Sequence, residues 1–121
     1  MKKVAISSEG PGLDDRVDPR FGRAAGFVVV DLDSMEVSYI DNGSTQMMSQ
    51  GAGIQAAELI VKAGCGSVLT GFVGPKAFQA LSAAKVDVVQ NMDGLTVRQA
   101  VEKFRSGGLK AAQAPNRRPG R

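Results

Sequence analysis

The sequence predicts an α/β domain built on a mixed five-stranded sheet, in the element order βββαβαβα. Residues 3–41 hold short apolar runs of strand length that are separated by turn signals. After Asn42, helical apolar stripes alternate with further short apolar runs, a pattern typical of strand-helix-strand units. A chain of 121 residues with 43% hydrophobic residues is long enough to bury one core. We therefore expect a single domain with helices on the faces of its sheet.

Three strands are expected in the first third of the chain. Residues 3–8 alternate apolar side chains with smaller or polar ones. Residues 25–32 form a second apolar run, and the turn at Asp33-Ser34 leads into a third strand over residues 35–41. The second and third strands therefore form a hairpin, so one strand of the sheet must run against the others.

The first predicted helix begins at Gly51 and ends at Lys62. Its apolar stripe is expected to consist of Ile54, Ala57 and Val61, which recur at helical spacing. This stripe should be the face that the helix turns toward the core.

Two more strand-helix pairs complete the predicted sheet. Residues 67–70 form a short strand, and Pro75 then occupies the first position of a helix, where its missing N–H costs nothing. Residues 86–89 form the fifth strand, and Thr96 with Gln99 makes a capping box at the start of the last helix. Strands joined through helices should be parallel, with right-handed crossovers.

The loop before the second strand carries the motif Asp18-Pro19-Arg20-Phe21-Gly22-Arg23. A guanidinium is always charged and presents a planar fork of donors. Two of them on a loop beside a strand indicate an anion-binding site. The alternative is a surface loop whose arginines pair with the neighbouring carboxylates.

Two further loops should lie beside this arginine loop. In sheets of this kind, ligands collect at the carboxyl ends of the parallel strands. Gly51-Ala52-Gly53 opens the first helix there, and residues 70–74 join the fourth strand to the second helix. Helix N-termini present N–H groups and a partial positive charge, which favours anions.

These motifs resemble, in order and spacing, those of the dinitrogenase iron-molybdenum cofactor biosynthesis family, over residues 3–106. The matching segments are 18–23, 51–57, 69–75 and 77–81. The resemblance implies a ribonuclease H-like three-layer fold and the binding of a molybdenum-containing metal-sulfur cluster. A chain of one domain without histidine is most similar to the small stand-alone members, which hold a molybdenum-copper sulfide cluster without covalent protein ligands.

The resemblance implies a site in which Arg20 and Arg23 make charge-assisted bonds to an anionic cluster. Glycine N–H groups would add further donors, because glycine lets the main chain approach closely. Met47 and Met48 offer thioethers, which suit copper(I); alternatively, one of them packs and the other is merely exposed. The candidate cofactor-binding residues are Arg20, Phe21, Gly22, Arg23, Met47, Met48, Gly51, Ala52, Gly53, Gly71, Phe72, Val73 and Gly74.

The composition excludes several classes of protein. The chain has no histidine and one cysteine, so zinc fingers, haem ligation by histidine, Ser-His-Asp triads and internal disulfides are ruled out. That cysteine, Cys65, precedes the fourth strand at its amino end, where a small buried hydrophobe is expected. A nuclease of ribonuclease H-like fold needs carboxylates around two metals, including one on the first strand, and Val4–Ser8 has none. We therefore expect a non-catalytic protein.

Residues 107–121 have the composition of a basic, flexible tail. Four of the fifteen basic residues lie there, so the rest of the chain carries nearly equal numbers of basic and acidic residues. Nucleic acid is therefore not an expected partner of residues 1–106. An alternative function is a protein-interaction or nucleic-acid-binding module that acts through this tail. With no membrane-spanning window and no secretory signal, we expect a cytoplasmic monomer, and the sequence identifies no partner protein.

Overall fold

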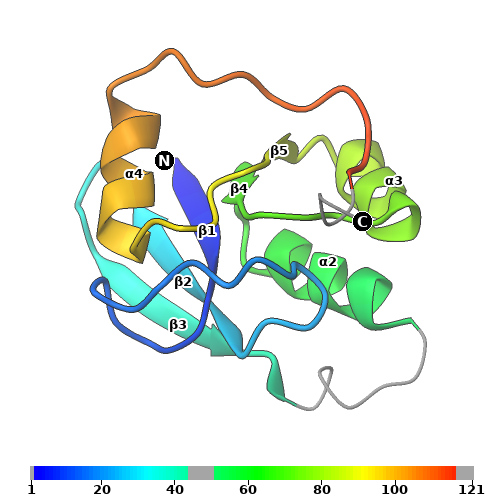
Figure 1. Ribbon diagram of the computed structural model, residues 1–121, viewed down its shortest axis with the longest axis horizontal. Helices are drawn as coiled ribbons and strands as arrows, with labels where there is room; N and C mark the ends of the chain where they lie inside the picture. Colours follow the sequence, from blue (N-terminus) through cyan, green and yellow to red (C-terminus); the bar gives the residue numbers. More distant parts are fainter. Residues whose placement is uncertain (1, 44–50, 117–121) are drawn as a thin grey trace.

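The computed structural model describes residues 2–43 and 51–116 and shows the predicted α/β fold (Figure 1). The element order βββαβαβα is confirmed, and the strands form one sheet in the order β3-β2-β1-β4-β5. The strands are β1 (Lys3–Ser8), β2 (Gly26–Asp31), β3 (Val37–Asp41), β4 (Ser67–Leu69) and β5 (Asp87–Val89); the helices are α2 (Ala52–Lys62), α3 (Pro75–Ala83) and α4 (Val97–Arg105).

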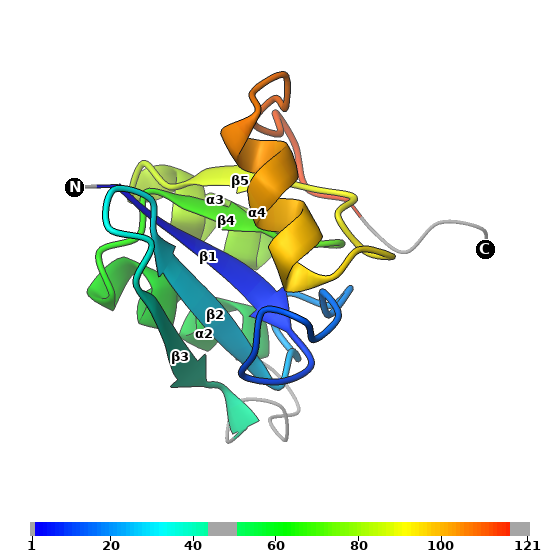
Figure 2. The ribbon, with the colours of Figure 1, turned by 90° about the vertical axis from the view of Figure 1, so that its left-hand side faces the viewer.

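The sheet is mixed, as the predicted hairpin requires. Strand β2 pairs antiparallel with both β1 and β3, whereas β1, β4 and β5 are mutually parallel. Helices α2 and α3 cover one face of the sheet and α4 covers the other (Figure 2). These three layers confirm the ribonuclease H-like arrangement that the resemblance implied.

The buried core has one part on each face of the sheet. The central strand β1 contributes to both parts, because its side chains alternate between the two faces. Val4 and Ile6 are fully buried on the α4 side, and Ala5 is fully buried on the side of α2 and α3. A strand that is covered on both faces must be apolar throughout, which explains why residues 3–8 contain so few charged side chains.

Helix α2 is turned differently from the prediction. Ile54 and Val61 are 38% and 43% exposed, so two of the three predicted stripe residues are wrong. The buried residues include Ala56, Ala57 and Ile60, which contact the core beside α3. Small side chains let two helices approach closely, so the helix packs through its alanines rather than through its larger apolar residues.

Local sequence signals set the helix ends, and the two predicted start signals, the capping box and Pro75, are in place. The Thr96 side chain accepts from the N–H of Gln99, and the Gln99 side chain accepts from the N–H of Thr96, which completes the capping box. Pro75 stands at the first position of α3, and Gly64 adopts a φ of 78° just after α2. Both placements match the backbone requirements of these two residue types.

Residues 107–116 run from the end of α4 back toward α3 (Figure 1). Leu109 packs against the α4 side of the core, and the Ala112 N–H donates to Val88 O at 2.7 Å. Residues 117–121 lie outside the described residues, so a flexible basic tail over 107–121 stays a prediction. Within the described residues, no helix is long and apolar enough to cross a membrane.

Candidate functional site

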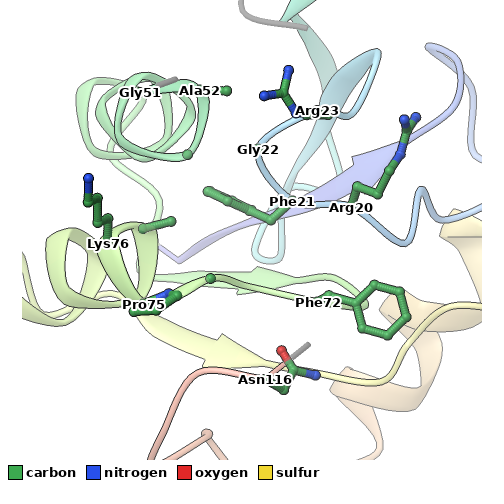
Figure 3. Close-up of a pocket in the computed structure, with 13 residues that line it drawn as sticks. Arg20, Phe21, Gly22, Arg23, Gly51, Ala52, Phe72, Pro75, Lys76 and Asn116 are labelled. Carbon is green, nitrogen blue, oxygen red and sulfur yellow. The ribbon is translucent and has the colours of Figure 1, made fainter. Parts of the chain in front are cut away.

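An open pocket of about 720 Å³ lies where the arginine loop meets the N-termini of α2 and α3 (Figure 3). It is at the carboxyl-end side of the parallel strands, as predicted. Nine of the predicted site residues line it together with four that the sequence analysis missed. The lining consists of Arg20, Phe21, Gly22, Arg23, Gly51, Ala52, Gly53, Phe72, Gly74, Pro75, Lys76, Ala77 and Asn116.

Four predicted site residues are not in this lining. Gly71 packs against the arginine loop, since a Cβ at this position would lie 2.6 Å from Pro19 O. Val73 is fully buried in the core beneath the pocket. Met47 and Met48 lie outside the described residues, so their proposed contact with copper stays a prediction.

Asp18 fixes the first arginine of the loop. Its carboxylate is buried and accepts from the Arg20 backbone N–H at 3.0 Å, from Nε at 3.2 Å and from Nη2 at 3.3 Å. The Arg20 guanidinium therefore points away from the two helices (Figure 3). The sequence left open whether the loop arginines bind an anion or pair with neighbouring carboxylates. Arg20 pairs with a carboxylate, that of Asp18.

Arg23 lies on the other side of the loop. Its guanidinium is directed toward the space in front of Gly51 and Ala52 (Figure 3). Because the two arginines diverge, they present their charges to different parts of the surface.

The arginine loop and the loop after β4 are paired through their backbones. The Phe21 N–H donates to Phe72 O at 3.1 Å, and the Phe72 N–H donates to Pro19 O at 2.7 Å. Beneath them, the buried Ser7 hydroxyl donates to Asp18 O at 2.7 Å and lies 2.7 Å from Thr70 Oγ1. The two loops therefore form one connected wall of the pocket.

Asn42 anchors the arginine loop from below. Its side chain is fully buried, and Nδ2 donates to Gly22 O at 3.3 Å and to Ala24 O at 3.0 Å. These two carbonyls flank Arg23, so Asn42 sets the path of the backbone that carries this arginine. Asn42 Oδ1 has no hydrogen-bond partner among the described residues.

Two helix N-termini open onto the pocket without a side-chain cap. Gly51 precedes α2 with a φ of 81°, and Gly74 precedes α3 in an extended conformation. Among the described residues, no side chain caps either helix, and neither first turn has an acidic residue. The first N–H groups of a helix have no intrahelical acceptor, so these helix ends offer donors and partial positive charge to a ligand.

The charged side chains that line the pocket are cationic. Among the described residues, Arg20, Arg23 and Lys76 line it and no aspartate or glutamate does, while the carboxylate of Asp18 pairs with Arg20 beside it. Phe72 is partly exposed and adds aromatic surface to the pocket, whereas the Phe21 ring is buried in the core beside it (Figure 3). This combination of cations, helix N-termini and apolar surface suits a large, weakly hydrated anion.

Lys76 and Asn116 are the functional candidates that sequence reasoning missed. Lys76 follows Pro75 in the first turn of α3, so its place beside the predicted anion site could have been found from the sequence. Asn116 reaches the pocket from a segment that has no helical or strand periodicity. No local signal marks it.

Cys65 is separated from the pocket by the length of β4. It precedes that strand, is 5% exposed and belongs to the core beside α2 and α3. Burial raises the pKa of the Cys65 thiol to about 11, although nearby Lys3 acts in the opposite direction. The thiol is therefore protonated near neutral pH, which matches the predicted role of a small buried hydrophobe.

The fold is that of a family of cofactor-binding proteins. The chain belongs to the dinitrogenase iron-molybdenum cofactor family, which matches residues 1–107. It is similar to the apo form of the orange protein from Desulfovibrio gigas, with 58% identity, a TM-score of 0.94 and coverage of 97% of this chain and 98% of that one.

Two more distant relatives extend the same similarity. The NMR structure of a proposed NifB protein from Thermotoga is 32% identical with a TM-score of 0.83, covering 99% of this chain and 100% of that one. An uncharacterized protein from Methanocaldococcus jannaschii is 26% identical over 112 residues, which is 90% of each chain.

Proposed function

We propose that this chain is a non-catalytic carrier that holds a molybdenum-containing metal-sulfur cluster non-covalently as an anion. The cluster would be of the molybdenum-copper sulfide or iron-molybdenum cofactor type. One observation carries the proposal: two helix N-termini and the cationic side chains of Arg23 and Lys76 line one pocket, to which none of the described residues contributes a carboxylate. Family membership and the similarity to the orange protein favour a metal-sulfur cluster over a simple anion.

In this proposal, different residues of the pocket make different kinds of contact with the cluster. Arg23 and Lys76 supply charge-assisted donors, and the first N–H groups of α2 and α3 supply neutral ones. Phe72, which is partly exposed, supplies polarisable, apolar surface for the sulfides. The Arg20 guanidinium pairs with Asp18 and points away from the two helices, so we assign it the role of shaping the loop rather than of holding the cluster.

The cluster keeps its own sulfides as metal ligands in this account. Across residues 2–43 and 51–116, no three His, Cys, Asp or Glu side chains gather where they could hold a metal ion. The Cys65 thiol is buried at the far end of β4. Met47 and Met48 remain the soft side chains that we propose as copper(I) ligands.

A non-catalytic role fits the chemistry of the lining. Nucleases of ribonuclease H-like fold use several carboxylates to hold two metal ions. Strand β1 carries none over Val4–Ser8, and none of the described residues that line the pocket is an aspartate or glutamate. Positive charge without a carboxylate suits the retention of an anion.

The proposal is tested by mapping the binding of tetrathiomolybdate, with and without copper(I), through backbone amide shifts. We expect shifts over residues 20–23, 51–53 and 72–77, and none around Cys65 or along α4. Molybdate is the matched control because it has the same charge and shape but strongly hydrated oxygens. We expect it to bind more weakly, and shifts confined to Cys65 or to residues 107–115 would overturn the proposal.

A further inference from the structure

The segment after α4 returns to the pocket and contributes a residue to it. Gly107 and Gly108 have φ values of 84° and 87°, which turn the chain out of the helix. The segment then lies along β5, where the Ala112 N–H donates to Val88 O and the Gln90 side chain donates to Ala114 O at 2.8 Å. It ends, within the described residues, at Asn116 in the pocket lining (Figure 3).

Asn116 is bound to the loop after β4 by three hydrogen bonds. Its Nδ2 donates to Gly71 O at 2.9 Å, and its Oδ1 accepts from the Val73 N–H at 2.8 Å. Its own backbone N–H donates to Val73 O at 3.0 Å. The side-chain amide thus pairs with both polar groups that flank Phe72, in the way that a neighbouring strand would.

These bonds complete the support of the loop that carries Phe72. The arginine loop holds the N–H and C=O of Phe72 itself through Pro19 and Phe21. Asn116 holds the groups on either side of it. Val73 is followed directly by Gly74, the residue that precedes α3, so the same bonds fix the start of this helix.

We propose that Asn116 is a positioning residue of the pocket, which sets the Phe72 wall and the N-terminus of α3 for the bound anion. The C-terminal segment is then part of the binding site rather than an appendage. This inference rests on the proposed function, since the anion is the ligand whose affinity the wall controls. If the hydrogen-bond donors of the pocket are not held in place before binding, they must be ordered when the anion binds. This ordering costs free energy and lowers the affinity.

The test compares Asn116→Ala with Gln90→Ala as a matched control. Gln90→Ala removes a side-chain bond to the same segment but leaves the loop after β4 untouched. Affinity for tetrathiomolybdate with copper(I) is measured by absorbance titration, and the induced visible circular dichroism of the bound chromophore reports its orientation. Exchange of the Val73 amide reports the loop without any ligand. Asn116→Asp serves as a second variant for the exchange measurement alone, since it keeps the acceptor for Val73 and loses the donor to Gly71 but adds a negative charge to the pocket; Val73 exchange should stay slower in it than in Asn116→Ala.

We expect Asn116→Ala to weaken binding by about tenfold or more, to change the induced circular dichroism at saturation and to speed Val73 exchange. Gln90→Ala should leave all three close to the unmodified protein. Equal effects of both variants, or unchanged affinity and exchange in Asn116→Ala, would overturn the inference while the proposed function stands. Failure of the unmodified chain to bind the cluster would instead reject the proposed function, and unchanged Val73 exchange would then reject the loop assignment as well.

Discussion

Gly22 of the arginine loop lies directly against the backbone of Gly53 in the first turn of α2. A Cβ on Gly22 would be 2.9 Å from Gly53 Cα and 3.0 Å from its nitrogen. This contact brings the loop that carries Arg23 onto the helix N-terminus that faces the same pocket. Arg23 and the N-terminus of α2 therefore face the same pocket, because neither Gly22 nor Gly53 has a side chain that would hold the loop and the helix apart.

We expect Gly22→Ala to lower the free energy of unfolding by about 1–3 kcal/mol and to weaken cluster binding, because the loop and α2 must move apart. Gly66→Ala is the control, since a Cβ there meets nothing within 4 Å. Urea denaturation of both variants measures the difference. A Gly22→Ala protein as stable as the Gly66→Ala protein would show that the contact is not tight.

Replacing Asn42 by alanine should destabilise the protein by roughly 1–3 kcal/mol, because Gly22 O and Ala24 O would lose buried donors. Cluster affinity should fall with it, since these carbonyls flank Arg23. Ser38→Ala on the exposed strand β3 is a suitable control. If the amides of residues 22–24 keep their chemical shifts in Asn42→Ala, the anchoring role is wrong.

The two arginines of the loop should differ in their effect on binding. Arg23→Gln should weaken the binding of tetrathiomolybdate with copper(I) by roughly tenfold or more, the value of one charge-assisted hydrogen bond. Arg20→Gln should have a clearly smaller effect, because the Arg20 guanidinium points away from the helices, whereas that of Arg23 is directed toward the start of α2. Side-by-side absorbance titrations decide this, and a larger loss in Arg20→Gln would reverse our assignment.

Alkaline pH should destabilise the protein through Cys65. Folding raises the pKa of its thiol from 9.0 to about 11 through burial, so the neutral thiol stabilises the folded state fully below pH 9. This contribution should be lost as pH rises toward 11, by about 2 kcal/mol. Burial also raises the pKa of Tyr39, which contributes to the same loss of stability at alkaline pH. The stability of Cys65→Ala should therefore still fall with pH, but less steeply than that of the unmodified protein. Denaturation series at pH 7–11 measure both slopes, and equal slopes would contradict the assignment.

Local chemistry made much of the fold predictable. The Thr96-Gln99 capping box and Pro75 at a helix start need only neighbouring residues, and both stand where the sequence placed them. The rotation of α2 was not predictable, because the choice between Ile54 and Ile60 as the buried residue depends on how closely α3 packs.

The site was predictable where adjacent motifs form it and hidden where distant segments complete it. Arg23 and Gly51 were found from motifs that converge at one edge of the sheet. Asn116 forms hydrogen bonds with Val73 and Gly71, which are 43 and 45 residues away in the sequence. No sequence periodicity predicts such a contact. The pairing of Arg20 with Asp18 was one of two open alternatives, because sequence proximity alone does not fix where a guanidinium points.

The most direct test of the anion-binding account is a titration of tetrathiomolybdate with copper(I) into three variants, followed by cluster absorbance. The double variant Arg23→Gln, Lys76→Gln removes two charges from the pocket, and Lys103→Gln, Arg105→Gln removes two from α4 on the opposite face. We expect the pocket pair to lose on the order of a hundredfold in affinity, while the α4 pair and Cys65→Ala stay close to the unmodified protein. Abolished binding in Cys65→Ala with full binding in the pocket pair would contradict the account, because the cluster would then be held through sulfur.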